Sequence, residues 1–405
     1  MNKNSIKKNY IYLFILLFLI ASLAQSFSYS IFNTYFNTYI RMSFYYIFGI
    51  SIIYIYFKNL NTSNFVSERF QKFYNFLIIY FFISIIFGII NAEDYWDYKY
   101  VFESYIPWTF TLFALFLGLN FKNHLRYFKN IFLILLILSI LFLFLDNGKM
   151  AYVRILASLY IFILFANDLS LKYKILILSV SLVILFLDIG SWRTNQLRLI
   201  YLIFLYFFSF FILILPRAII GLYSSFLLLV PIGILISFII FNFDFFIYLS
   251  SLDLKVMTSE NTRTFILNDI FNHFRETNSS YLIGSGPQSY FFTFFMQESM
   301  THYNKIARYA VESGLLNLLL KNGLFGIILL LIVNFLAIKN LLILSNNLFS
   351  KKLALVISFN WIIFFIETPM TLQISSFLFF YLLGVAFSKD FLKMNDKEIK
   401  EYLNK

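Results

Sequence analysis

The sequence predicts an all-α, polytopic integral membrane protein with about twelve transmembrane helices. Composition is the first observation behind this prediction. Of the 405 residues, 60% are hydrophobic and only 13% are charged, whereas a soluble globular domain carries about 25% charged residues. Length is the second observation, because a single water-soluble core stops growing beyond roughly 250–300 residues. A chain of this size and composition has more apolar surface than folding in water can bury.

The helices are predicted from runs of apolar residues. A membrane helix needs about 20 mostly apolar residues, and about twelve segments approach that length. In chain order they are Tyr10–Ser26, Ile40–Phe57, Phe73–Ile90, Tyr105–Asn120, Phe128–Leu145, Tyr152–Ala166, Ile175–Gly190, Leu197–Leu215, Ile219–Tyr248, Leu315–Ile338, Leu353–Ile366 and Leu372–Phe387. The shorter ones need local thinning of the bilayer to span it. No internal repeat is visible, so we expect a single membrane domain over residues 1–405.

Basic residues predict the orientation of these helices. The net charge of +12 does not indicate nucleic-acid binding, because Lys and Arg are scattered between apolar runs. Cytoplasmic loops of membrane proteins carry an excess of Lys and Arg. If Lys7 and Lys8 lie inside, most other basic residues also fall inside, and the acidic segment from Glu93 to Glu103 falls outside. We therefore expect both termini to be cytoplasmic.

The largest polar stretch runs from about Leu249 to Asn322, before the tenth predicted helix, and the same count places it outside. It contains Gly284-Ser285-Gly286-Pro287, which has the composition of a turn. The part from Asp253 to Glu276 suits a short amphipathic helix. The other outside loops are short, so we expect a polar substrate to be handled by this large extracytoplasmic loop.

Four arginines on the outer side are the first sign of chemistry: Arg154, Arg193, Arg198 and Arg263. A guanidinium group stays charged and presents a planar fork that fits phosphate oxygens. Charges in membrane segments are unfavourable and usually face a cavity or a partner. These arginines therefore suggest contacts to an anionic lipid headgroup such as a diphosphate. For each arginine alone, snorkelling at a helix end is an equally open interpretation.

Histidine and glutamate supply candidates for a base. Histidine has an unperturbed pKa of about 6.5, so His302 suits removal of a proton from a sugar hydroxyl. Glu312 follows ten residues later and is a second candidate, although its spacing from Arg308 also fits an ordinary ion pair on a helix surface. Of the other two histidines, we expect His124 to be a solvated surface residue in an inside loop and His273 to be structural.

The sequence contains no pattern typical of a metal or cofactor site. There is no Asp-x-Asp pair and no His-x-x-x-His pair, and the absence of cysteine excludes disulfides, Cys-ligated zinc and a thiol nucleophile. Gly284-x-Gly286 is too short to indicate a nucleotide site. We therefore expect chemistry that needs neither a metal nor a cofactor.

The order of motifs in the second half resembles a known group. A short outer loop with Ser191-Trp192-Arg193 precedes the large loop, which opens with Thr262-Arg263 and contains the Gly284 turn and His302. The loop closes with Val311-Glu312-Ser313-Gly314. This pattern resembles the O-antigen polymerase and O-antigen ligase superfamily, most closely the Wzy-type polysaccharide repeat-unit polymerases. The match covers residues 188–387 by motif order and the first half only by hydropathy.

The resemblance implies metal-independent glycosyl transfer on the outer face of a bacterial inner membrane. The donor would be a glycan on undecaprenyl diphosphate and the acceptor a single lipid-linked repeat unit, with a flippase and a chain-length regulator as further partners. Arg193 and Arg263 would contact the diphosphate and sugars, and His302 would lie near the chemistry. Gly284, Gly286 and Gly314 would form the loop.

Three other functions stay open. The first is an O-antigen ligase, although ligases tend to have Asn, Ser or Gln directly after the histidine, whereas Tyr303 follows His302 here. The second is a flippase or transporter for lipid-linked sugars, a class in which inverted repeats and broken helices are typical. The third is a structural membrane protein without catalysis.

Overall fold

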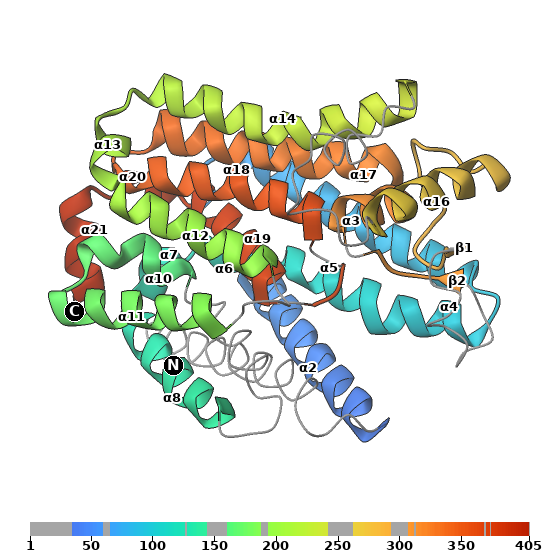
Figure 1. Cartoon of the computed structure of the whole chain (residues 1–405), viewed down its shortest axis with the longest axis horizontal. Coiled ribbons are helices and arrows are strands. Elements are labelled where there is room, and N and C mark those ends of the chain that lie inside the picture. The colour runs from blue at the N-terminus through green and yellow to red at the C-terminus, as the bar shows by residue number, and fades with distance from the viewer. Residues whose placement is uncertain are drawn as a thin grey trace.

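The computed structural model describes residues 35–59, 65–125, 128–143, 160–187, 193–241, 262–292, 307–311, 313–367, 370–372 and 374–404. Within these ranges most residues are helical, and the helices lie side by side in one bundle with two ends (Figure 1). The end that carries the C-terminus is called the C-terminal end. The opposite end carries α4 (Tyr95–Tyr100), β1 (Phe291–Phe292) and β2 (Ala307–Arg308), and is called the loop end.

The helices follow the apolar segments of the sequence. In the first half of the chain they are α2 (Tyr35–Asn59), α3 (Glu68–Ile90), a π-helical turn (Val101–Tyr105), α5 (Ile106–Leu112), α6 (Ala114–Gly118), α7 (Phe121–Leu125), α8 (Phe128–Leu143), α10 (Tyr160–Phe165) and α11 (Leu171–Leu187). In the second half they are α12 (Arg193–Phe207), α13 (Ser209–Ile214), α14 (Arg217–Phe241), α16 (Thr262–Glu276), α17 (Gly314–Lys339), α18 (Phe349–Glu367), α19 (Ile374–Ala386), α20 (Lys389–Lys393) and α21 (Asp396–Asn404).

Length and composition identify the membrane-embedded part. Within the described residues, five helical stretches are long and apolar enough to cross a membrane: Glu68–Ile90, Tyr95–Gly118, Arg217–Ser237, Gly314–Leu344 and Phe349–Ile366. Shorter apolar helices run over Met42–Phe57, Gln196–Phe207 and Ser375–Ala386. The chain is thus an all-α membrane protein. Each predicted segment from Ile40–Phe57 onward overlaps a described helix, whereas Tyr10–Ser26 lies outside the described residues. The total of twelve spans stays a prediction.

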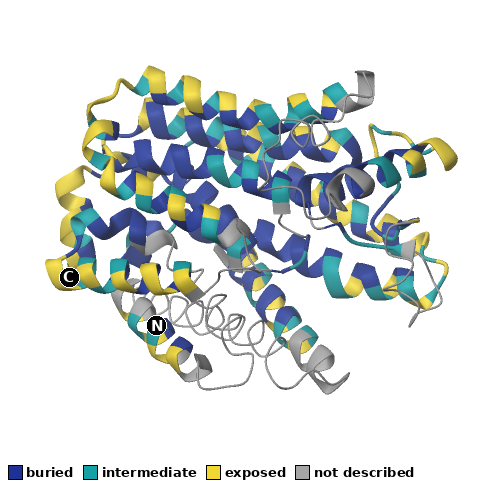
Figure 2. Cartoon of the chain, in the orientation of Figure 1, coloured by how far each residue is buried: buried dark blue, intermediate teal, exposed yellow. Residues whose placement is uncertain are grey.

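The outside of the bundle is covered by large apolar side chains. Ile83 on α3 is 60% exposed and Phe226 on α14 is 63% exposed. Figure 2 shows exposed residues recurring along α14, while α18, which packs against it, is mostly buried. A soluble protein rarely exposes a continuous apolar surface of this kind. The pattern fits helices whose outward faces contact lipid.

The centre of the bundle is held by direct backbone contact between α6 and α19. Gly118 on α6 lies against Gly384 on α19, and a Cβ atom on Gly118 would be 2.8 Å from the Gly384 Cα. Small residues at a helix crossing let two backbones approach closely, which is a common way to pack membrane helices. The two helices therefore form a tightly packed pair.

The long helix α17 is interrupted at Gly323, whose φ of 67° and ψ of −170° are not helical. A break of this kind separates backbone donors and acceptors from their usual partners within the helix. Inside a membrane such groups must be satisfied by other parts of the protein. The break lies in the N-terminal half of the helix, near the loop end, and it determines how the loop attaches to the bundle.

A turn over residues 281–286 supplies hydrogen-bond partners for backbone groups of α17 near the break. Backbone N–H groups and carbonyl oxygens of the turn and of α17 pair across the break in three hydrogen bonds: Ser285 to Leu320 at 2.7 Å, Leu324 to Tyr281 at 2.8 Å and Phe325 to Leu282 at 3.0 Å. The hydroxyl of Tyr80 on α3 donates to the carbonyl of Asn322 at 3.1 Å. Lys321 and Asn322 belong to the overlap between the predicted loop (Leu249–Asn322) and the predicted helix (Leu315–Ile338), and the structure places both within α17.

The prediction of a solvated position for His124 is wrong. His124 is 5% exposed, and its Nδ1 lies 2.8 Å from the hydroxyl oxygen of Tyr381. The C-terminal helices α20 and α21 pack against α7, which carries His124, and they cover this part of the C-terminal end. Local sequence around His124 contains no information about these distant helices. Burial lowers the pKa of His124 to about 4.

Candidate functional site

The predicted site residues fall into three groups. Arg154, His302 and Glu312 lie outside the described residues. Arg193 is the first residue of α12 and Arg263 is the second residue of α16, and for both only the backbone is described. The third group is fully described and consists of Arg198, Gly284, Gly286 and Gly314. The site is therefore built from the described residues around Arg198 and around the loop turn.

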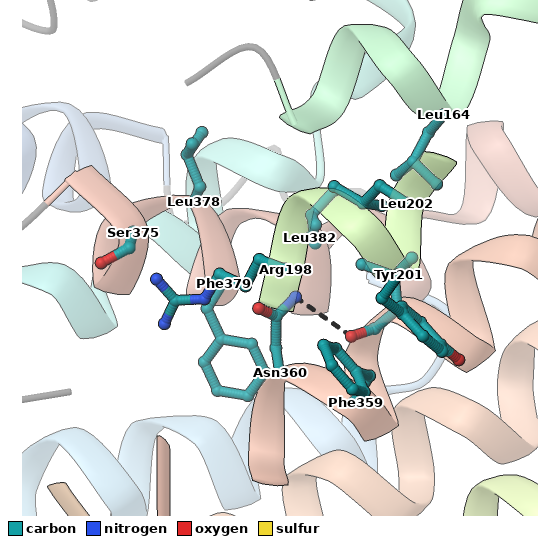
Figure 3. Close-up of a pocket in the computed structure, with 11 residues that line it drawn as sticks. Leu164, Arg198, Tyr201, Leu202, Phe359, Asn360, Ser375, Leu378, Phe379 and Leu382 are labelled. Carbon is teal, nitrogen blue, oxygen red and sulfur yellow. Dashed lines mark hydrogen bonds between the residues drawn. The ribbon is translucent and has the colours of Figure 1, made fainter. Parts of the chain in front are cut away.

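Arg198 lines a cavity of about 30 Å³ between α12, α18 and α19 (Figure 3). It is 8% exposed, and it belongs to the half of α12 that points toward the loop end. Asn360 on α18 and Ser375 on α19 line the same cavity. An adjoining space of about 10 Å³ adds Ser376, whose hydroxyl is buried and has no partner among the described residues. A buried arginine in an apolar bundle typically faces a cavity or a partner.

The rest of the cavity wall is aromatic and aliphatic. Tyr201 stacks on Phe359 with ring centroids 3.9 Å apart and an interplanar angle of 10°. The Tyr201 hydroxyl donates to the Leu355 carbonyl at 3.3 Å. Leucines and Phe379 complete the wall. The cavity thus combines one cation and a few neutral polar groups with an apolar wall, and its volume is about that of one water molecule.

A second polar cluster lies at the loop end, around Lys321 of α17. Lys321 is 1% exposed, and its Nζ donates a hydrogen bond to the carbonyl of Ser289. The ammonium group lies 4.2 Å from the centroid of the Tyr100 ring. Asp97 on α4 is 5% exposed, and its negative charge acts electrostatically on Lys321. Tyr309 donates to Asp97 Oδ1 at 2.8 Å. The cluster joins α4 and α17 to the two loop segments that carry Ser289 and Tyr309.

His273 connects α16 to the same cluster. Its Nε2 lies 3.1 Å from the Ser285 hydroxyl, and the Ser285 amide bonds to Leu320 of α17. Burial, and secondarily the charge of Lys321, lower the pKa of His273. Both effects favour the neutral form of the ring. This geometry agrees with the structural role expected for His273, since the side chain ties α16 to the turn.

The loop glycines adopt conformations that favour glycine. Gly284 has a φ of 83° and Gly286 has a φ of 95°, values that other residues rarely adopt. A Cβ atom on Gly284 would lie 2.6 Å from the amide nitrogen of Gly323. Gly314 instead begins α17 directly after its N-cap, Ser313. The turn thus approaches the membrane helix more closely than a chain with side chains at these positions would allow.

The described residues contain no group of three His, Cys, Asp or Glu side chains that is suited to hold a metal ion. Comparison with protein-family models, with curated proteins and with solved structures finds no match. The function of the chain therefore has to be argued from the site itself. The resemblance drawn from the motifs stays an expectation.

Sequence reasoning selected Arg198 but missed the residues around it. Asn360 was hidden in a predicted membrane segment, although a polar side chain inside an apolar run is a usable signal. Asp97 was read only as a marker of topology, and Tyr100 was not singled out. Their roles depend on contacts with α17, which is more than two hundred residues away in the chain. A single sequence gives no direct information about such a contact.

Proposed function

We propose that the chain is a membrane glycosyltransferase that joins lipid-diphosphate-linked oligosaccharide repeat units into a surface polysaccharide, on the outer face of the bacterial inner membrane. The observation that carries the proposal is the buried guanidinium of Arg198 in a cavity with Asn360 and Ser375. A fixed cation within an apolar bundle is suited to the diphosphate of a lipid carrier, whose tail stays in the bilayer.

The reaction assigns a clear task to this cation. An acceptor hydroxyl attacks the anomeric carbon of the donor, the new glycosidic bond forms, and the bond from that carbon to the diphosphate oxygen breaks. The lipid diphosphate leaves with an additional negative charge, and the hydroxyl proton passes to a base. Arg198 stabilises the developing charge, because a preorganised cation in a dry site acts strongly on it. No cofactor is needed, since the diphosphate is already a good leaving group.

The remaining roles follow the sequence-based predictions. Arg154, Arg193 and Arg263 are assigned to the diphosphate and sugars, and His302 or Glu312 is assigned to the base. His273 is a less suitable base, because its Nε2 is engaged by Ser285. The neutral polar residues Asn360, Ser375 and Ser376 are suited to hydrogen-bond the diphosphate or the first sugar.

The ligase alternative uses the same chemistry with a different acceptor, and only the product separates the two. The transporter alternative is favoured by one observation, the broken helix α17. That break lies at Gly323, near the loop end rather than at the middle of the helix, and backbone groups of the 281–286 turn fill it. The break in α17 therefore serves to attach the loop to the bundle and does not line a transport site. For this reason we prefer the polymerase proposal.

Deletion of the gene, followed by separation of the surface polysaccharide on a gel, tests the proposal. We expect the ladder of polymer lengths to collapse to a single repeat unit, and we expect wild type to restore it. Arg198→Ala should fail to restore the ladder. Arg275→Ala is the matched control, because it removes an exposed arginine from α16 without touching the cavity. Long polymer that stays on its lipid carrier would indicate a ligase, and an unchanged ladder would refute both enzymes.

A further inference from the structure

A row of aromatic side chains leads from Lys321 to the surface of the loop end. Tyr100 and Tyr309 stack with ring centroids 5.9 Å apart and an interplanar angle of 25°. Tyr309 meets Tyr290 at 5.3 Å, and Tyr290 meets Phe292 edge-to-face at 5.5 Å. Tyr100 is buried, Tyr309 and Tyr290 are half-buried, and Phe292 is 54% exposed. These four residues are called the aromatic row.

The inner part of the row is fixed by polar contacts. The Tyr309 hydroxyl donates to Asp97, whose other carboxylate oxygen accepts the Glu93 amide at 3.0 Å. Burial and this hydrogen bond raise the pKa of Tyr309, so its hydroxyl stays protonated. The ammonium of Lys321 lies over Tyr100. Rings held in this way offer aromatic surface at little further loss of side-chain entropy.

The outer part of the row is held by the short sheet. Phe292 pairs with Ala307 across β1 and β2, at the loop end of the bundle next to α4 and α16 (Figure 1). Phe292 has no polar group with which to reach the bilayer surface. In an interfacial belt, Tyr and Trp place their polar tips among the headgroups, whereas Tyr309 directs its hydroxyl to the buried carboxylate of Asp97. An interfacial aromatic belt therefore does not explain why the Tyr309 hydroxyl points to Asp97.

We propose that the aromatic row, with the neighbouring carboxylate of Glu93, is a binding site for the pyranose rings of an oligosaccharide. This inference rests on the proposed function, which it deepens by placing the glycan at the loop end. A pyranose ring has an apolar face of C–H groups, which stacks on an exposed aromatic ring, and a rim of hydroxyls, which donate to carboxylates. Glu93 is exposed, and its backbone amide donates to the same Asp97 carboxylate that accepts from Tyr309, so Glu93 lies near the row and its carboxylate is a candidate acceptor for these hydroxyls.

The experiment measures binding by saturation-transfer NMR with the purified full-length protein. The probe is the repeat-unit oligosaccharide released by mild acid from the lipid carrier of a strain without the gene. We expect transfer to the pyranose protons with wild type and with Phe292→Tyr, which keeps the aromatic face. Phe292→Leu and Tyr290→Leu should weaken binding about 2- to 10-fold. Phe210→Leu is the control, since Phe210 is 67% exposed on α13 at the opposite end.

Two results would overturn the inference: no transfer with wild type, or binding by Phe292→Leu and Tyr290→Leu equal to that of wild type. Thermal unfolding of each variant shows whether it is folded, and Phe292→Tyr keeps the test valid if Phe292→Leu does not fold. If the oligosaccharide binds as expected but gene deletion leaves the polymer ladder unchanged, the proposed function fails and the sugar site stands. If deletion removes the ladder while Phe292→Leu binds normally, the sugar site fails and the function stands.

Discussion

Gly284 and Gly323 meet backbone to backbone where the 281–286 turn enters the break in α17. A Cβ atom on Gly284 would lie 2.6 Å from the amide nitrogen of Gly323, and one on Gly323 would lie 2.5 Å from the amide nitrogen of Gly284. Both residues have a positive φ. Any other residue at either position would therefore strain the backbone and displace its neighbour. This contact connects the helix that carries Lys321 to the turn that carries Ser285.

Gly323→Ala should lower the free energy of unfolding by about 1–4 kcal/mol, because alanine is strained at this φ and its Cβ meets the Leu282 backbone. The control is Gly233→Ala on α14, where an added Cβ meets no atom within 4 Å. Alanine should stabilise that helix by about 0.5–1 kcal/mol. Thermal unfolding in detergent measures both. Equal changes in melting temperature for Gly323→Ala and Gly233→Ala would contradict the break in α17 at Gly323.

Lys321→Met should destabilise the protein by about 1–3 kcal/mol, because it leaves the buried Ser289 carbonyl without its donor and removes a cation that interacts electrostatically with the buried Asp97. Asp97→Asn should relieve part of this loss, since it removes the uncompensated charge. A double-mutant cycle on thermal stability should give a coupling of about 0.5–3 kcal/mol between the two positions. Strictly additive effects would show that Lys321 and Asp97 do not interact.

Stability should fall as the pH is lowered from 6.5 toward 4, because of His124. Its pKa in the folded protein is about 4, while in the unfolded chain it is about 6.5. In this window the unfolded state binds a proton that the folded state does not, so acid favours unfolding by up to about 3 kcal/mol. His124→Gln should flatten the dependence of the melting temperature on pH over this range. A slope as steep as that of wild type would place His124 in solvent.

A polyprenyl diphosphate should raise the melting temperature of the purified protein, because a ligand that binds only the folded state stabilises it. At a concentration 100 times the Kd the gain is about 2.7 kcal/mol. The matched polyprenol without phosphate should give no comparable shift. Arg198→Ala should abolish the response, and Arg198→Lys should weaken it, because lysine keeps the charge but loses the planar fork. Equal shifts for wild type and Arg198→Ala would exclude Arg198 as a diphosphate ligand.

The sequence was sufficient for the fold class, because membrane helices are specified by runs of apolar residues rather than by long-range contacts. The predicted segment Leu353–Ile366, for example, lies within α18 (Phe349–Glu367). The interruption of α17 was not predicted. The predicted segment Leu315–Ile338 contains Lys321, Asn322 and Gly323 but shows no sign of a break. The backbone groups that pair with the broken helix belong to the turn over residues 281–286 and come from another part of the chain.

The candidate site was predictable only in part. Arg198 was identifiable because an arginine close to an apolar run requires a cavity or a partner. From the sequence, Tyr290, Phe292 and Tyr309 were candidates for stacking on sugar rings or for an interfacial belt, whereas Tyr100 was not identifiable among the 29 tyrosines of the chain. His124 was misplaced for a related reason, since α20 and α21 cover it from the far end of the sequence.

Reconstitution of the reaction tests the central claim most directly. The purified protein is incubated in detergent with lipid-diphosphate-linked repeat units as the sole substrate, and the products are separated by length. We predict a ladder of repeat-unit multiples with wild type and with Arg275→Ala, and no product longer than the substrate with Arg198→Ala. Substrate returned unchanged by wild type, or elongation by Arg198→Ala at the wild-type rate, would contradict the account.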